Sequence, residues 1–178
     1  MLERDIFAGF GGQGVLLMGQ LLAQAGLYED KQVAWLPSYG PEMRGGTANC
    51  SVTISDKAVA SPIIDNPTSL VVMNRPSLDK FEKAVIPGGK IFVNSSIIDR
   101  KVEREDVDVY YVDCSAIALK LGNPKVANIV MLGAYIEATK CVEPETVIKA
   151  LQHKLGEKKA HLIPLNREAL EAGAACVK

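Results

Sequence analysis

The stretch Ile6–Gly14, with the sequence IFAGFGGQG, decides the fold that this chain is expected to adopt. It joins a short apolar run to the helical pattern of residues 15–27, and so predicts a first strand, a glycine-rich turn and a first helix. Gly9, Gly11 and Gly14 have the GxGxxG spacing, which lets a ligand approach the backbone closely. Unpaired N–H groups at the start of the helix favour an anion or another electron-rich group. Close packing of the helix on the strand explains the same glycines equally well.

The dinucleotide-binding fingerprint is incomplete in this sequence. It requires an acid at the end of the second strand, where the carboxylate holds a ribose. The second predicted strand, residues 32–37, is followed instead by SYG at residues 38–40. Glu29 and Asp30 precede this strand and therefore lie at its wrong end. The sequence thus disfavours NAD(P) as the ligand of the glycine loop.

Residues 38–46, with the sequence SYGPEMRGG, form a second unusual stretch. They follow a strand, which is where open α/β sheets bind ligands. Arg44 offers a planar fork of donors for carboxylate or phosphate, and Tyr39 offers an aromatic platform. A solvated loop with a surface pair of Glu42 and Arg44 is the alternative. The residues predicted to contact a cofactor or partner are Gly11, Gly12, Gln13, Gly14, Ser38, Tyr39, Arg44, Gly45 and Gly46.

The rest of the chain alternates between strand and helix patterns. Residues 47–54 alternate apolar and polar side chains, and with a turn at 55–57 and a returning strand at 58–61 they predict an antiparallel hairpin. Further strands are expected at 70–73, 90–94 and 107–112, and helices at 78–84, 113–121, 126–139, 143–155 and 165–177. The predicted fold class is α/β, a three-layer Rossmann-like sandwich with a mostly parallel sheet and an antiparallel hairpin. One domain spanning residues 1–178 is expected.

The predicted helix 126–139 carries two residues of interest. Gly133 lies in a largely apolar stripe and would allow close helix packing. Asn128 either points toward the ligand-binding edge of the sheet or is a buried structural amide held by hydrogen bonds.

Composition and charge exclude several classes of function. The net charge is −1 over 178 residues, with lysine and arginine spread along the chain, which disfavours nucleic acid and acidic membranes as partners. The first residues show no signal-peptide pattern, and no apolar run reaches the roughly 18 residues that span a bilayer. A cytoplasmic protein is therefore expected.

The sequence contains few residues suited to catalysis. Its four cysteines lie singly, without the CxxC or CxxH spacing of zinc, haem or iron–sulfur sites, and are expected to be small core residues: Cys50, Cys114, Cys141 and Cys176. His153 and His161 make a poor metal site, and neither a GxSxG motif nor a P-loop is present. A sheet edge built to bind ligands, combined with few residues able to drive chemistry, predicts a subunit that shapes or closes a site belonging to another chain.

The two glycine-rich stretches resemble those of a known family. GFGGQG at 9–14 and SYGPEMRGG at 38–46, with Asn123, Asn128 and MLGA at 131–134, resemble the gamma subunit of 2-oxoacid:ferredoxin oxidoreductases. The continuation TANCSV at 47–52 is most similar to the 2-oxoglutarate enzymes, with pyruvate, branched-chain oxoacid and indolepyruvate enzymes as close relatives. The resemblance implies an oxidative decarboxylation in which a 2-oxoacid and coenzyme A give acyl-CoA, carbon dioxide and reduced ferredoxin.

The resemblance also implies how the work is divided among subunits. Thiamine diphosphate and the iron–sulfur clusters are expected on the partner alpha, beta and delta chains, and no cofactor on this chain. The gamma chain would pack on the catalytic core, help form the coenzyme A side of the site, meet ferredoxin only through the complex and be inactive alone. An isolated gamma chain is open to self-association. Two alternatives remain, a stand-alone NAD(P)- or flavin-binding oxidoreductase and a purely structural assembly module.

Overall fold

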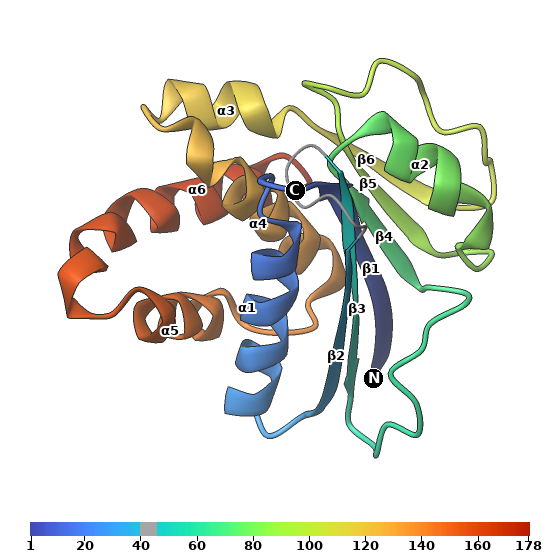
Figure 1. Cartoon of the computed structure of the whole chain (residues 1–178), viewed down its shortest axis with the longest axis horizontal. Coiled ribbons are helices and arrows are strands. Elements are labelled where there is room, and N and C mark those ends of the chain that lie inside the picture. The colour runs from blue at the N-terminus through green and yellow to red at the C-terminus, as the bar shows by residue number, and fades with distance from the viewer. Residues whose placement is uncertain (40–45) are drawn as a thin grey trace.

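Six strands form one sheet in residues 1–39 and 46–178, which are the residues that the computed structural model describes, with Tyr39 as backbone only (Figure 1). The strands are β1 (Leu2–Phe10), β2 (Gln32–Tyr39), β3 (Thr47–Ser55), β4 (Ser69–Val72), β5 (Lys90–Asn94) and β6 (Asp108–Val112). The helices are α1 (Val15–Tyr28), α2 (Arg75–Phe81), α3 (Cys114–Lys120), α4 (Ala127–Thr139), α5 (Pro144–Leu155) and α6 (Ile163–Ala175). Shorter 3₁₀ turns span Glu82–Ala84, Pro124–Val126 and Glu157–Leu162.

Helices cover both faces of the sheet, as expected for the predicted α/β sandwich. α1 and α4 pack on one face, α2 packs over β4 and β1 on the other, and α5 and α6 lie outside α1 and α4 (Figure 1). β1 shows why both faces are covered, because Phe7 packs among the residues of α1 and α4 while Ile6 and Ala8 pack with those of α2. The α/β class is confirmed.

β3 runs antiparallel to both of its neighbours, β1 and β2, whereas β1, β4, β5 and β6 are parallel. The antiparallel strand at 47–54 is therefore confirmed, but the hairpin partner at 58–61 is wrong, since these residues are not in a strand. β1 pairs with β3 over their whole length, from Leu2 opposite Ser55 to Phe10 opposite Thr47. Such a ladder pairs more backbone groups than a four-residue return strand could, because a strand's hydrogen bonds increase with its length.

β1 begins earlier than predicted, because β3 pairs with it from Leu2 onward. The charged start of the chain consequently lies in the sheet, and Asp5 is fully buried. The Tyr135 hydroxyl of α4 donates a hydrogen bond to Asp5 Oδ2 over 2.5 Å. Burial, with a smaller effect of the Glu3 charge, raises the pKa of the Asp5 carboxyl well above its usual value.

α4 is buried around its circumference rather than only along the predicted stripe, since every residue from Asn128 to Ile136 is buried. The side of α4 that faces away from the sheet is covered by α6. Two glycines allow this contact: a Cβ on Gly133 would overlap the Leu170 carbonyl oxygen, and a Cβ on Gly173 would overlap that of Val130. The close packing predicted at Gly133 is confirmed.

Candidate functional site

The glycine loop, residues 11–14, lies at the carboxyl end of β1. β2, β4, β5 and β6 end at this same edge of the sheet, because they run in the direction of β1. α1 leaves β1 on one face, and α2 leaves the neighbouring β4 on the other (Figure 1). This change of face makes the β1/β4 boundary a topological switch point, where open α/β sheets bind ligands.

The conformation of the loop explains two of its glycines. Gly12 and Gly14 have positive φ angles of 95° and 77°, which glycine adopts most readily. Gln13 folds back over the turn: its Oε1 accepts the Phe10 N–H over 2.6 Å and its Nε2 donates to the Met73 carbonyl over 3.0 Å. Gln13, predicted as a ligand contact, therefore holds the loop against the end of β4.

The two predicted segments meet at this edge. The Gly11 N–H donates to the Gly46 carbonyl over 2.8 Å, so the glycine loop lies beside the residue that precedes β3. Ser38, near the end of β2, is exposed at the same edge and pairs with Asn49 of β3. The predicted contacts Arg44 and Gly45, and the Tyr39 side chain, lie outside the described residues.

Not every N–H group of the loop is available to a ligand. Gly11 donates to Gly46, and the Gln13 N–H donates to the Phe10 carbonyl over 3.2 Å. The remaining donors in the described structure are Gly12, Gly14 and the first turn of α1, which carries no acidic residue. These donors and the helix dipole favour an anionic group here.

A polar cleft of about 180 Å³ opens beside the loop at the switch point. Its polar lining consists of Gln13, Asn94, Ser115, Lys125 and Asn128. Asn94 Nδ2 donates to Ser115 Oγ over 3.3 Å, which ties the end of β5 to the start of α3. Lys125 is exposed and brings a positive charge to the rim of the cleft.

Asn94, Ser115 and Lys125 were not predicted as site residues. For Asn94 a signal existed, because it is the polar last residue of a strand and follows the apolar run at 91–93, and so reaches the carboxyl edge of a parallel sheet. Asn128 is both a buried structural amide and a residue at the ligand-binding edge, the two alternatives that the sequence left open. It is buried, donates to the Gly14 carbonyl over 3.4 Å and lines the cleft.

An apolar hollow of about 210 Å³ lies on the other side of the glycine loop. Its lining includes Phe10, Leu16, Leu17 and Ala48. The loop backbone therefore stands between a polar and an apolar surface. This arrangement can bind a molecule that carries both anionic and apolar parts.

The described lining of the cleft is suited to binding rather than proton transfer, since it offers amides, a hydroxyl and an ammonium group. The cysteines do not change this. Cys50, Cys114 and Cys141 are buried, as predicted for core residues, whereas Cys176 is exposed. Burial raises the pKa of the Cys50 and Cys114 thiols to about 12 and that of Cys141 to about 11, so these thiols are protonated at neutral pH.

The described residues hold neither a metal-binding cluster nor a membrane-spanning helix. No three His, Cys, Asp or Glu side chains gather there as a metal ion would require, so the described residues do not fit a metal or cluster. No described helix combines the length and the apolar character needed to cross a membrane.

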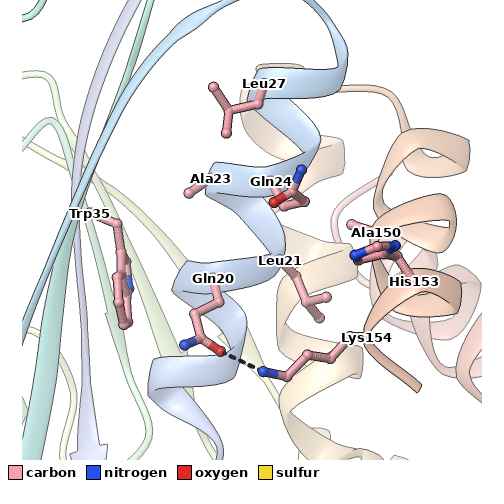
Figure 2. Close-up of a pocket in the computed structure, with 9 residues that line it drawn as sticks. All are labelled: Gln20, Leu21, Ala23, Gln24, Leu27, Trp35, Ala150, His153 and Lys154. Atoms are coloured by element: carbon pink, nitrogen blue, oxygen red, sulfur yellow. Dashed lines mark hydrogen bonds between the residues drawn. The ribbon is translucent and has the colours of Figure 1, made fainter. Parts of the chain in front are cut away.

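A separate groove of about 310 Å³ runs along α1 and is lined by Trp35 of β2 and by residues of α5 (Figure 2). Figure 2 shows Lys154 reaching Gln20, to whose Oε1 it donates over 3.4 Å. His153 lies on the rim and is exposed. The groove contains none of the predicted contact residues, so the cleft at the glycine loop remains the candidate site.

Replacing Gly14 with alanine should lower the free energy of unfolding by about 2 kcal/mol. The new Cβ would overlap Asn128 Nδ2 and would also be strained at φ 77°. Chemical denaturation of Gly14→Ala, Asn128→Ala and the double variant measures the effect. In the double variant, Asn128→Ala should recover the part of the Gly14→Ala stability loss that comes from the overlap. A double variant whose loss equals the sum of the two single losses would contradict this contact.

The chain is similar in sequence and structure to known proteins. Residues 4–176 match the family described as pyruvate ferredoxin/flavodoxin oxidoreductase. The chain is 42% identical over 168 residues to ketoisovalerate oxidoreductase subunit VorA of Methanothermobacter thermautotrophicus, covering 94% of this chain but only 35% of that protein. It is 38% identical over 149 residues to 2-oxoglutarate synthase subunit KorC of Methanocaldococcus jannaschii, covering 81% of this chain and 79% of that protein.

A solved structure shares the whole fold. The gamma subunit of the keto/oxoacid ferredoxin oxidoreductase from Geobacter sulfurreducens superposes with a TM-score of 0.83 at 30% identity, covering 98% of both chains. The matching part therefore includes the sheet, the glycine loop and the helices on both faces.

Proposed function

Because the chain belongs to the pyruvate ferredoxin/flavodoxin oxidoreductase family, we propose that it is the gamma component of a 2-oxoacid:ferredoxin oxidoreductase. The complex would convert a 2-oxoacid, coenzyme A and oxidised ferredoxin into acyl-CoA, carbon dioxide and reduced ferredoxin. The single observation that carries the proposal is the full-length likeness to a gamma subunit, with 98% of both chains covered. The alpha, beta and delta components are the proposed partners.

The proposed role of this chain is to form the coenzyme A side of the active site. The N–H groups of Gly12 and Gly14 and the Lys125 ammonium would bind phosphate groups, and Arg44 would add a further cation. Coenzyme A itself supplies the thiol that accepts the acyl group. The described residues suit this role because a polar cleft and an apolar hollow lie on the two sides of one loop.

Thiamine diphosphate and the iron–sulfur clusters are proposed to lie on the partner components. The described residues of this chain do not bring together the side chains that an iron–sulfur cluster or a metal ion needs, so the proposed chemistry involves no metal on this chain. All four cysteines are free thiols. A reducing compartment favours this state, so the cytoplasm is the proposed location.

The proposed oxoacid is 2-oxoglutarate, which the likeness to KorC and the stretch at 47–52 support. The higher identity to VorA favours ketoisovalerate instead. Rates of ferredoxin reduction by the reconstituted complex with 2-oxoglutarate, ketoisovalerate and pyruvate would decide between them. The fastest reduction is expected with 2-oxoglutarate.

Arg44→Ala should raise the half-saturating concentration of coenzyme A about tenfold in the reconstituted complex, because an anion loses a charged hydrogen bond. The maximal rate should change little. Arg167→Ala is the matched control, since Arg167 pairs with Glu145 on the surface and should leave both values unchanged.

Other results would favour the alternatives. An unchanged coenzyme A dependence together with weaker assembly would support a structural module. Protection of the isolated chain against heat by NAD(P) or a flavin would support a stand-alone oxidoreductase.

A further inference from the structure

A second hollow lies at the opposite end of the sheet from the glycine loop. Its floor is the end of the β1/β3 ladder, where Leu2 pairs with Ser55 and Arg4 pairs with Thr53. Its wall is the segment 57–63, part of the connection from β3 to β4 that runs beside the start of β1 (Figure 1). The volume of this Arg4 hollow is about 680 Å³, within the range of pockets that hold small organic ligands.

Two polar groups in the floor have no partner among the described residues. Arg4 Nε and Thr53 Oγ1 are buried atoms without a hydrogen bond, and Thr53 is only 3% exposed. The two residues are directly opposite in the ladder, so their side chains emerge side by side on the same face. A buried polar group without a hydrogen bond destabilises the folded state, so such groups usually form a hydrogen bond with a ligand or an ordered water.

The charges around the hollow favour an anion. None of the ion pairs between described residues involves Arg4. Lys57 lines the same hollow and adds a second cation. Asp56 also lines it, but its Oδ2 is bound to the Met1 amino group over 2.6 Å. The charges of Asp56 and the Met1 amino group therefore offset each other, and Arg4 and Lys57 leave the hollow with a net positive charge.

Apart from Ser61, the remaining wall is apolar. Leu2 and Ile63 line the hollow and are 53% and 65% exposed, and Ala58, Val59 and Ala60 complete the wall. Apolar side chains exposed beside cationic groups are typical of sites for organic acids, because a cation orients the charged end and the wall binds the hydrocarbon part.

We propose that the Arg4 hollow is a binding site for a small organic carboxylate, whose charged group meets Arg4 and Thr53 and whose apolar part lies against Val59 and Ile63. The site is distant from the glycine loop, since it lies where β1 begins and the loop lies where β1 ends. It is independent of the proposed role in a coenzyme A site.

Titration of the chain with hexanoate tests the proposal. In ¹H–¹⁵N spectra, hexanoate should shift the Arg4 Nε–H resonance in a saturable way, whereas 1-hexanol and inorganic phosphate should not saturate it in the same range. Arg4→Gln should raise the dissociation constant about tenfold or more, because a charged hydrogen bond is lost. Arg167→Gln is the control, and binding should be unchanged, since this surface arginine pairs with Glu145.

Thr53→Val keeps the test decisive if Arg4→Gln does not fold. Valine has nearly the same shape but lacks the unpartnered hydroxyl, so the variant should unfold at a higher temperature in the absence of ligand while binding hexanoate several-fold more weakly. No saturable shift with hexanoate would overturn the proposal. Equal binding of phosphate, or unchanged hexanoate binding in both variants, would overturn it as well.

Discussion

Gly173→Ala is expected to lower the free energy of unfolding by about 3 kcal/mol or more. The added Cβ would overlap the Val130 carbonyl oxygen, which belongs to the backbone of α4 and cannot rotate away as a side chain could. The two helices would have to separate. Alanine favours a helix over glycine by about 1 kcal/mol, so a loss of this size means that the contact between α4 and α6 outweighs local helix propensity.

Urea denaturation of Gly173→Ala, Gly133→Ala and the double variant would measure this loss. Gly133 meets the Leu170 carbonyl oxygen across the same contact, so both substitutions force the same separation of the helices. The double variant should therefore lose less stability than the sum of the losses of the two single variants. Glu171→Ala on the exposed side of α6 is the control and should change stability by no more than about 0.5 kcal/mol. A Gly173→Ala variant as stable as the original chain would show that the helices are not packed this closely.

The second large effect concerns the buried Asp5 carboxyl and pH. Its pKa is raised above the ordinary value of 3.8 by burial, so the folded chain keeps a proton that the unfolded chain releases. Stability must then fall as the pH rises from the unfolded pKa toward the folded one, by about 1.4 kcal/mol per pH unit. The stability that protonated Asp5 contributes is fully present below about pH 4 and is lost above the folded pKa.

Asp5→Asn should remove this pH dependence, because an amide has nearly the same shape and does not ionise. The unfolding free energy of the original chain, relative to that of Asp5→Asn, should decline as the pH rises above about 4 and should level off once the pH passes the folded pKa. Parallel curves would mean that Asp5 does not carry a proton in the folded state.

Asp106→Asn gives a control of opposite sign. A hydrogen bond from Arg104 lowers the pKa of the Asp106 carboxyl, so the stability contributed by Asp106 is present above its unfolded pKa and lost as the pH falls through its folded value. The difference in unfolding free energy between the original chain and Asp106→Asn should therefore shrink toward low pH. The contribution of protonated Asp5, measured as the difference between the original chain and Asp5→Asn, is greatest at low pH.

Part of the candidate site was predictable because it depends on local sequence. The glycine loop at 11–14 and its place between β1 and α1 follow from the GxGxxG spacing and the neighbouring apolar patterns. The meeting of the loop with Gly46 follows from strand ends sharing one edge of a sheet. Ser115 and Lys125 were not predictable in this way, since they reach the cleft through α3 and the turn before α4, far along the chain.

The sequence by itself determined the α/β class, the bounds of β5 at Lys90–Asn94 and, to within one residue, the start of α5, because periodicity, proline and glycine act over a few residues. Only the tertiary structure decided that β3 lies between β1 and β2, that Asp5 is buried beneath Tyr135, and that Arg4 and Thr53 share a hollow. Strand partners and burial are set by contacts between distant segments, and the free energy of those contacts is not contained in any local pattern.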